Sequence, residues 1–262
     1  MQRPNSKAMT KQFTELTDSQ WEAISPFFDL KRKRKLCLRS VLNGILYILR
    51  TGCQWRNLPL CFPHWRAVNH YFEKWKKDST FEAINQKLNA DDRTREGREP
   101  CPSLLCVDSQ SVRLQPPVFE DRGTDAHKRV NGRKRHLAVD TGGRLWAARV
   151  GPANAHDGTE GCALLAERAW WMHRLERILG DGPYLGQFAE QVQGLGAVFE
   201  HASRPESAEG FVPVAHRWVV ERSISWTNFF RRLVKDYEYT VESSVAWLVL
   251  ANVTIMLQRI PG

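Results

Sequence analysis

Apolar residues recur every three or four positions in residues 16–90, which is the spacing of amphipathic helices. Thr17–Gln20 has the composition of a capping box, so we expect the first helix to begin there. The apolar positions of residues 38–49 and 65–75 predict two longer helices, and Ser79–Glu82 predicts the cap of a fourth. This part of the chain is therefore expected to be all α-helical.

Beyond residue 103 the pattern changes to short apolar runs bounded by turn residues, which is typical of strands. Residues 104–112, 137–140 and 145–150 predict three strands in meander order. The basic segment 127–136 contains Asn131-Gly132, a strong hairpin signal, so we expect a basic tip beside the first strand. The remaining expected elements are helices at 159–175, 186–195, 217–235 and 241–258, and short strands at 177–184 and 197–200.

These patterns divide the chain into four parts. We expect a polar tail over 1–15, a helical domain over 16–90 and a linker containing glycine and proline over 91–103. A domain of alternating helices and strands is expected over 104–262. The predicted fold class is therefore α/β, preceded by an all-α domain.

The net charge of +9 lies entirely in the helical part of the sequence. Residues 1–90 hold 16 Lys and Arg against 7 Asp and Glu, whereas residues 91–262 hold 22 of each. Such segregation is typical of a segment that meets a polyanion, most often nucleic acid. The densest run of cations is interpreted as a phosphate-contacting arm, with a solvated loop as the alternative. It consists of Lys31, Arg32, Lys33, Arg34 and Lys35.

Two helices joined by a tight turn in a basic segment suggest a helix-turn-helix DNA-binding unit. A plain helical bundle has the same periodicity and stays open as the alternative. The side chains expected to face DNA from the second of these helices are His64, Arg66, Asn69 and His70.

The six cysteines form no Cys-x-x-Cys pair and no zinc-binding spacing, which suits a reducing cytoplasm. The N-terminus carries no apolar signal segment. The longest apolar stretch, Ala246–Leu257, is too short to span a bilayer. We therefore expect a cytoplasmic protein without a membrane partner.

Three carboxylates stand out by their positions. Asp108 ends the apolar run Leu104–Val107, Asp181 ends the run at 177–180, and Glu221 lies on a predicted helix. Strand ends form the usual active site of an α/β sheet. If the three converge, they can hold two Mg²⁺ ions about 3.5–4 Å apart, which would suit phosphodiester chemistry. Turn or capping aspartates and a salt-bridging glutamate are the alternatives.

The helix predicted over 217–235 has a polar stripe opposite an apolar side. Glu221 is the only acid on this stripe, so the stripe is interpreted as a DNA-facing surface around a metal-binding carboxylate. Its other members are Arg217, Ser225, Asn228, Arg231, Arg232 and Lys235. Two further aspartates, Asp140 and Asp157, are interpreted as turn or capping residues.

Several segments, in the same order along the chain, resemble the DDE transposases of bacterial insertion sequences, most closely the IS-five group. These segments are Val107–Ser111, Gly132–His136, Ala138–Thr141, Asp181–Tyr184, Arg217–Arg222 and Arg231–Glu238. Residues 16–84, which include Thr51–Pro59, are similar to that group's N-terminal DNA-binding domain. The resemblance covers about residues 15–258.

The resemblance implies a ribonuclease-H-like catalytic core in which Asp108, Asp181 and Glu221 are the catalytic and metal-binding triad. It implies two Mg²⁺ ions per active site, with Mn²⁺ as a substitute. The implied activity is that of a transposase, which binds insertion-sequence ends, cleaves them and joins the freed 3′-hydroxyl to target DNA. A catalytically inactive helix-turn-helix regulator and a ribonuclease-H-fold nuclease are the alternatives.

The partners implied are double-stranded DNA, as terminal inverted repeats and target, and further copies of the chain in a synaptic complex at the bacterial nucleoid. A homodimer or a higher oligomer is expected there. The basic tip is expected to contact phosphates near the cleavage site through Lys128, Arg129, Arg133, Lys134 and Arg135.

The wider family's glutamate signature is Tyr-x2-Arg-x3-Glu-x6-Lys, and this chain follows it in part. Arg217 and Glu221 match, whereas Val214 replaces the tyrosine and Asn228 the lysine. The cations that could replace the missing lysine from nearby turns are Arg231, Arg232 and Lys235.

Overall fold

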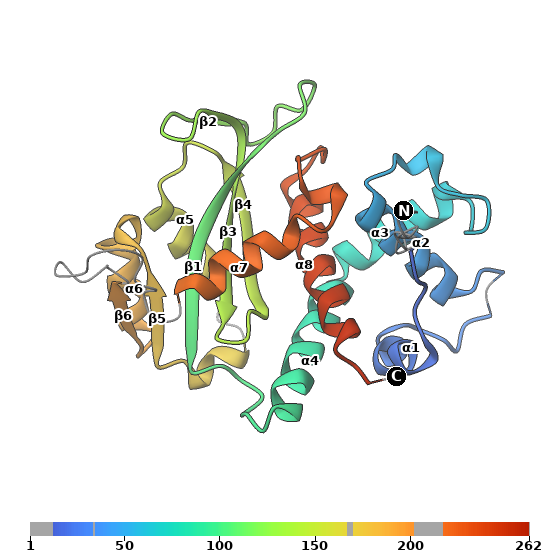
Figure 1. Cartoon of the computed structure of the whole chain (residues 1–262), viewed down its shortest axis with the longest axis horizontal. Helices are drawn as coiled ribbons and strands as arrows, with labels where there is room; N and C mark the ends of the chain where they lie inside the picture. The colour runs from blue at the N-terminus through green and yellow to red at the C-terminus, as the bar shows by residue number, and fades with distance from the viewer. Residues whose placement is uncertain (1–12, 34, 167–169, 202–216, 262) are drawn as a thin grey trace, which may run out of the picture.

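The computed structural model describes residues 13–33, 35–166, 170–201 and 217–261. Every described element before residue 104 is helical, as predicted (Figure 1). These elements are α1 (Asp18–Ile24), α2 (Leu38–Thr51), α3 (Trp65–Lys77) and α4 (Thr80–Arg95), with short 3₁₀ helices at Ser25–Phe27 and Trp55–Asn57.

Local sequence signals set several helix ends. Thr17 accepts a hydrogen bond from the Gln20 backbone and Gln20 accepts one from the Thr17 backbone, so the predicted capping box is confirmed. Gly52 ends α2 in a left-handed conformation, with φ of 70°. The predicted cap at Ser79 is wrong, because this residue has a φ of 57° and its side chain makes no capping hydrogen bond.

A sheet occupies the second part of the chain. Its strands are β1 (Leu104–Arg113), β2 (Gly123–Asp125), β3 (Val130–Asp140), β4 (Leu145–Pro152), β5 (Arg177–Gly180) and β6 (Val198–His201). The strand order is β2-β3-β1-β5-β6, and β4 also pairs with β3. β1, β3 and β4 form the predicted antiparallel meander, whereas β5 and β6 run parallel to β1.

The predicted hairpin turn at Asn131-Gly132 is wrong, because this segment lies inside a strand. β3 begins at Val130, and Gly132 pairs with both β1 and β2. The turn that precedes β3 is Ala126–Arg129. A Cβ atom at Gly132 would lie 1.9 Å from the carbonyl oxygen of Val112, so glycine here permits a close strand approach.

Helices cover both faces of the sheet (Figure 1). They are α5 (Asp157–Leu164), α6 (Gln187–Gly194), α7 (Arg217–Thr227) and α8 (Val241–Gln258), with 3₁₀ turns at Trp170–Arg174, Gly182–Tyr184 and Arg231–Leu233. Leu105 and Val107 of β1 point into the core formed with α5 and α6. Leu104 and Cys106 point into the opposite core, formed with α7 and α8.

The N-terminal helices share this second core with α8. The ring of Trp247 stacks on Phe72 of α3 with centroids 4.5 Å apart, and the Trp55 ring lies 5.8 Å from Trp247. Arg50, near the end of α2, donates a hydrogen bond to the Phe229 carbonyl at 2.6 Å. The predicted domain boundaries stay a prediction, and a cut after residue 90 would pass through this shared core.

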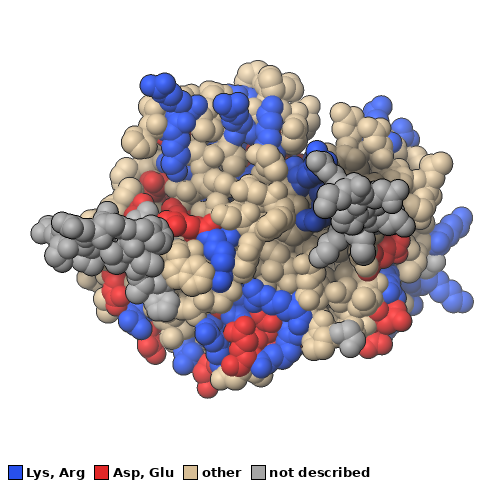
Figure 2. Space-filling view, viewed as in Figure 1, with Lys and Arg blue, Asp and Glu red and all other residues tan. Residues whose placement is uncertain are grey.

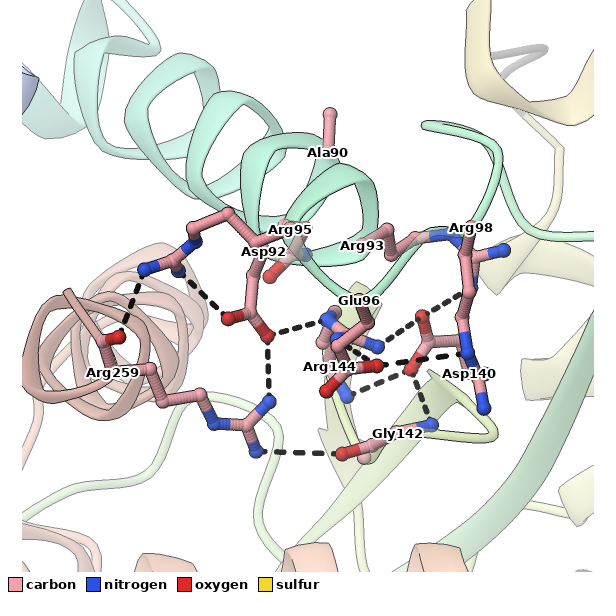
Figure 3. A network of polar contacts seen from close by, with 12 residues as sticks. Ala90, Asp92, Arg93, Arg95, Glu96, Arg98, Asp140, Gly142, Arg144 and Arg259 are labelled. Atoms are coloured by element: carbon pink, nitrogen blue, oxygen red, sulfur yellow. Dashed lines mark hydrogen bonds and ion pairs between the residues drawn. The ribbon is translucent and has the colours of Figure 1, made fainter. Parts of the chain in front are cut away.

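α4 extends to Arg95, beyond its predicted end near residue 90, because its last turn is anchored to two distant segments (Figure 3). The Asp92 carboxylate accepts hydrogen bonds at 2.7 Å from Arg144, after the β3–β4 turn, and from Arg259, after α8. Burial alone would raise the pKa of Asp92, but the hydrogen bonds and charges of Arg259 and Arg144 hold it below its usual value.

Asp140 lies in the same network and is fully buried (Figure 3). Its carboxylate pairs with Arg93 at 2.7 Å and with Arg144 at 3.3 Å, and it also accepts a hydrogen bond from the Gly142 backbone. The interpretation of Asp140 as a simple turn residue is therefore incomplete. Its charge joins α4 to the β3–β4 turn inside the protein, where loss of one partner is costly.

By length and composition, α8 could cross a bilayer. However, 67% of this stretch is buried inside the protein, as is usual for a core helix. A cluster of amides ties it to its neighbours: Asn252 donates to Asn85 and Asn89, and both of these donate to the Leu145 carbonyl. Thus α8, like α4, connects the N-terminal helices to the sheet.

Candidate functional site

Two neighbouring strands bring Asp108 and Asp181 to the same level of the sheet. β1 and β5 pair in parallel, with Cys106 opposite Leu179. Two residues further along, this register sets Asp108 opposite Asp181, which directly follows β5. Gly180 permits this approach, because a Cβ atom there would lie 2.9 Å from a β1 side chain.

Both aspartates lie on the face of the sheet that α7 covers. Side chains alternate along a strand, so Asp108 shares the face of Cys106. Asp181 has an extended backbone and, by the same alternation, shares the face of Leu179. Cys106 and Leu179 both belong to the core formed with α7, and both aspartates are half-buried.

α7 brings Glu221 to this face, where the helix crosses β1 (Figure 1). Val219 and Val220 of α7 are buried in the core on this face of the sheet. The Ser223 hydroxyl of α7 donates a hydrogen bond to the Gly143 carbonyl at 3.2 Å. Glu221 lies outside this buried arc and is exposed. Figure 2 shows acidic side chains gathered at the surface near the beginning of α7. The three predicted carboxylates thus belong to one face of the molecule.

The donor chemistry of this face suits a divalent metal, because hard cations prefer carboxylate oxygens. Within the described ranges, no three His, Cys, Asp or Glu side chains are already grouped as metal ligands. The residue types and their common face therefore fit a divalent cation, whereas the side-chain positions define no coordination geometry.

The helix predicted over 217–235 ends earlier, at Thr227. Phe230 and Leu233 turn inward and are buried in the core with α2 and α8, which breaks the helical path. Three residues of the predicted apolar side are instead between 47% and 64% exposed. They are Trp218, Phe229 and Val234.

The residues of the predicted polar stripe fall into two groups. Asn228 and Arg231 are exposed and Lys235 is half-buried, and their contact with DNA stays a prediction. Arg232 is only 9% exposed, and its Nε donates a hydrogen bond to the Glu238 carboxylate at 2.7 Å. The predicted surface position of Arg232 is wrong, because its guanidinium pairs with the buried carboxylate of Glu238.

Arg222 interrupts the apolar side of α7 in the sequence, and the structure explains it. Its guanidinium lies 4.4 Å from the ring centroid of Trp218 and 4.6 Å from that of Trp226. Such cation–π contacts let a charged group sit among apolar neighbours. The side chain of Arg217 and the whole of Val214 lie outside the part of the chain that the structure describes.

Three of the five cations predicted at the basic tip lie inside the protein. Arg133, Lys134 and Arg135 are 0%, 8% and 2% exposed, because β3 is a central strand with helices over both faces. Their predicted exposure is wrong, and they are not placed to meet DNA. Lys128 and Arg129 lie in the turn before β3 and are exposed as predicted.

The buried arginines hold the segment that follows α7. Arg133 donates to the Glu238 carbonyl at 2.9 Å and to the Ser244 hydroxyl at 3.1 Å. Arg135 donates to the Leu233 carbonyl at 2.8 Å, and burial lowers the pKa of this guanidinium. These contacts stabilise irregular backbone that has no helical partners of its own.

The N-terminal candidates lie at the surface. Arg66 and His70 are exposed on α3, and Asn69 is half-buried. His64 is exposed at the N-cap, where its ring accepts a hydrogen bond from the Arg66 backbone. The connection from Gly52 to His64 contains the turn predicted at Cys53–Pro63. It is longer than the turn of about three or four residues in a helix-turn-helix, so the plain helical bundle stays open as the alternative.

The basic run before α2 is also at the surface. Lys31, Arg32, Lys33 and Lys35 are exposed, and Arg34 lies outside the described residues. Their predicted contact with phosphates is compatible with this position and stays a prediction.

Sequence reasoning missed a polar cluster on the opposite face of the sheet, behind Asp108. It contains His136 and Tyr184, both fully buried, and Asp157, which lies 3.0 Å from the Lys134 amine. The interpretation of Asp157 as a capping residue is wrong, because His156 is the residue that caps α5. The only signal in the sequence was that His136 and Tyr184 fall within two of the segments that carry the family resemblance.

Comparison with known families agrees with this arrangement. A family model for transposases of the IS4/5 family matches residues 16–85, and a transposase DDE domain model matches residues 99–257. No curated protein matches the chain. The DDE match spans more than half of the chain and includes all three carboxylates of the candidate site. On these two matches, the chain belongs to the DDE transposases of the IS4/IS5 family.

Proposed function

We propose that this transposase binds the ends of its insertion sequence, cleaves them and joins the freed 3′-hydroxyl to target DNA. The observation that carries the proposal is the common face of Asp108 on β1, Asp181 directly after the adjacent β5, and Glu221 on α7, which packs on β1. The order of three antiparallel strands followed by two parallel strands supports a ribonuclease-H-like core.

Asp108, Asp181 and Glu221 would hold the divalent metal, Mg²⁺ or Mn²⁺, as two ions per site. When bound, the metal supplies activation of the attacking oxygen and stabilisation of the leaving oxygen of a phosphodiester. Asp108 is half-buried on β1 and Asp181 is half-buried directly after β5, whereas Glu221 is exposed on α7. Two ligands would therefore be held in place before DNA arrives, and the third would face the DNA.

The exposed cations would hold the DNA backbone around this face. Lys128 and Arg129 lie at the β2–β3 turn, and Arg231 follows α7. The positive N-terminal part of the chain would hold the inverted repeats, and a synaptic complex would need at least two copies. We place this reaction in the cytoplasm, at the nucleoid.

Charge-removing substitutions that keep side-chain size test the triad. Asp108→Asn, Asp181→Asn and Glu221→Gln should each abolish Mg²⁺-dependent cleavage and joining, because phosphoryl transfer depends on positioned charge. Binding to DNA that carries the flanking inverted repeats should persist in a mobility-shift assay.

Asp91→Asn is the matched control, because Asp91 is a partly exposed carboxylate of α4 in a surface pair with Lys87. It should cleave and join as the wild type does. Near-normal joining in Mg²⁺ by any triad variant would refute the assignment. Loss of DNA binding in all three would instead indicate that the carboxylates support the fold.

A further inference from the structure

Tyr184 is the last residue of the short turn that follows Asp181. Asp181 is followed by the 3₁₀ turn Gly182–Tyr184, in which the Tyr184 backbone donates a hydrogen bond to the Asp181 carbonyl at 3.1 Å. The aromatic ring is fully buried and belongs to the core on the α5 side of the sheet, together with Leu105 and Val107. The phenol is therefore on the opposite face of the sheet from the Asp108 and Asp181 side chains.

The Tyr184 phenol contacts residues of both β1 and β3 on this face of the sheet. Its oxygen lies 3.3 Å from Nδ1 of His136 on β3 and shares a hydrogen bond with the side chain of Ser109 on β1. Ser109 directly follows Asp108, and His136 is its cross-strand partner. One hydroxyl group thus connects the residue after Asp108 to the turn that carries Asp181.

Tight packing fixes the ring in this place. A Cβ atom at Gly161 of α5 would lie 2.9 Å from the Tyr184 ring and 2.9 Å from the Phe188 ring. The Phe188 ring itself is 5.3 Å from the Tyr184 ring, between centroids. Glycine at position 161 is thus what lets α5 approach, and the close-packed ring has little freedom to move.

The Tyr184 phenol and the His136 imidazole are both uncharged at neutral pH. A tyrosine phenol is protonated at neutral pH, so the Tyr184 hydroxyl can act as a donor. Burial lowers the pKa of His136 to about 4, so the imidazole is uncharged at neutral pH. The contact is therefore a neutral hydrogen bond in a dry site, where loss of a partner is costly.

We propose that Tyr184 is a positioning residue, which with Ser109 and His136 holds the Asp181 turn against the Asp108 strand from the opposite face of the sheet. This inference rests on the proposed metal-binding function of the two aspartates. Groups behind metal ligands keep them at the correct separation, and their loss typically weakens metal affinity by about 10–100-fold.

The test measures Mn²⁺ binding to the full-length protein directly, by electron paramagnetic resonance of the free ion. Tyr184→Phe keeps the ring and removes the hydroxyl, so Mn²⁺ should bind about tenfold more weakly. Tyr47→Phe, a matched loss of a phenol on α2, should bind Mn²⁺ as the wild type does. A thermal melt of each variant shows whether the fold is intact.

Ser109→Ala removes the other partner of the phenol, and it decides the question if Tyr184→Phe does not fold. Because the two groups act through one hydrogen bond, the double variant should bind Mn²⁺ no more weakly than Tyr184→Phe alone. Wild-type affinity in the folded Tyr184→Phe and Ser109→Ala variants would overturn the positioning role.

Glu221→Gln separates this inference from the function on which it rests. If Glu221→Gln binds Mn²⁺ as tightly as the wild type, the proposed carboxylate site itself is wrong. If Glu221→Gln is weakened and Tyr184→Phe is not, the site stands and only the positioning role of Tyr184 is wrong.

Discussion

Two stretches of this chain are rich in Lys and Arg, but the fold exposes the described cations of one and buries three cations of the other. In the run at 31–35, every cation that the structure describes is exposed. In the stretch 128–136, Arg133, Lys134 and Arg135 are buried within β3. The difference is that β3 is a central strand covered on both faces, whereas the first run precedes α2 on the surface. Charge density alone therefore does not identify a DNA-binding surface.

The largest effect should come from a buried cation of the second stretch. Arg133→Ala removes six hydrogen bonds and leaves Asp236 buried without this arginine, so unfolding should cost about 3–5 kcal/mol less. Urea unfolding at neutral pH measures this. Arg129→Ala, at the exposed turn of the same stretch, should change stability by no more than about 0.5 kcal/mol. Equal effects of the two substitutions would contradict the burial of Arg133.

An intermediate effect should come from the imidazole of the same stretch. Burial lowers the pKa of His136 to about 4, below its unfolded value of about 6.5. The unfolded state therefore binds more protons between these values, so stability should fall by about 3 kcal/mol as the pH drops from about 6.5 to about 4. Urea unfolding across this range measures the slope.

His136→Gln should remove this part of the pH dependence. His70→Gln, a matched loss of an exposed imidazole on α3, should leave it unchanged. A wild-type slope in His136→Gln would show that other groups cause the pH dependence.

The smallest effect on stability should come from the first stretch. Replacing Lys31, Lys33 and Lys35 together with alanine should change the unfolding free energy by less than about 0.5 kcal/mol per site, because all three are exposed. Affinity for end DNA should fall, and the salt dependence should lose about one unit of slope per phosphate contact removed.

Lys87→Ala is the control for this substitution, because it removes an exposed lysine of α4. Binding is measured by fluorescence anisotropy at several salt concentrations. An unchanged salt slope in the triple variant would mean that this run is only a solvated loop.

The sequence by itself determined the elements whose signals are local. The capping box at Thr17, the glycine end of α2 and the full length of α8 follow from neighbouring residues, and all three are as predicted. The three-strand meander and the two later strands also follow from short apolar runs. Such features depend on backbone conformation and side-chain periodicity, which act over a few residues.

Only the tertiary structure decided which polar residues are inside. Arg133 and Arg232 are buried because Asp236 and Glu238, distant or irregularly placed in the sequence, meet them in the core. α7 ends at Thr227 because Phe230 finds a buried site beside α2. The facing of Asp108 and Asp181 likewise depends on the pairing of β1 with β5. Burial and long-range pairing depend on residues that are distant in the sequence, so a local stretch of sequence does not determine them.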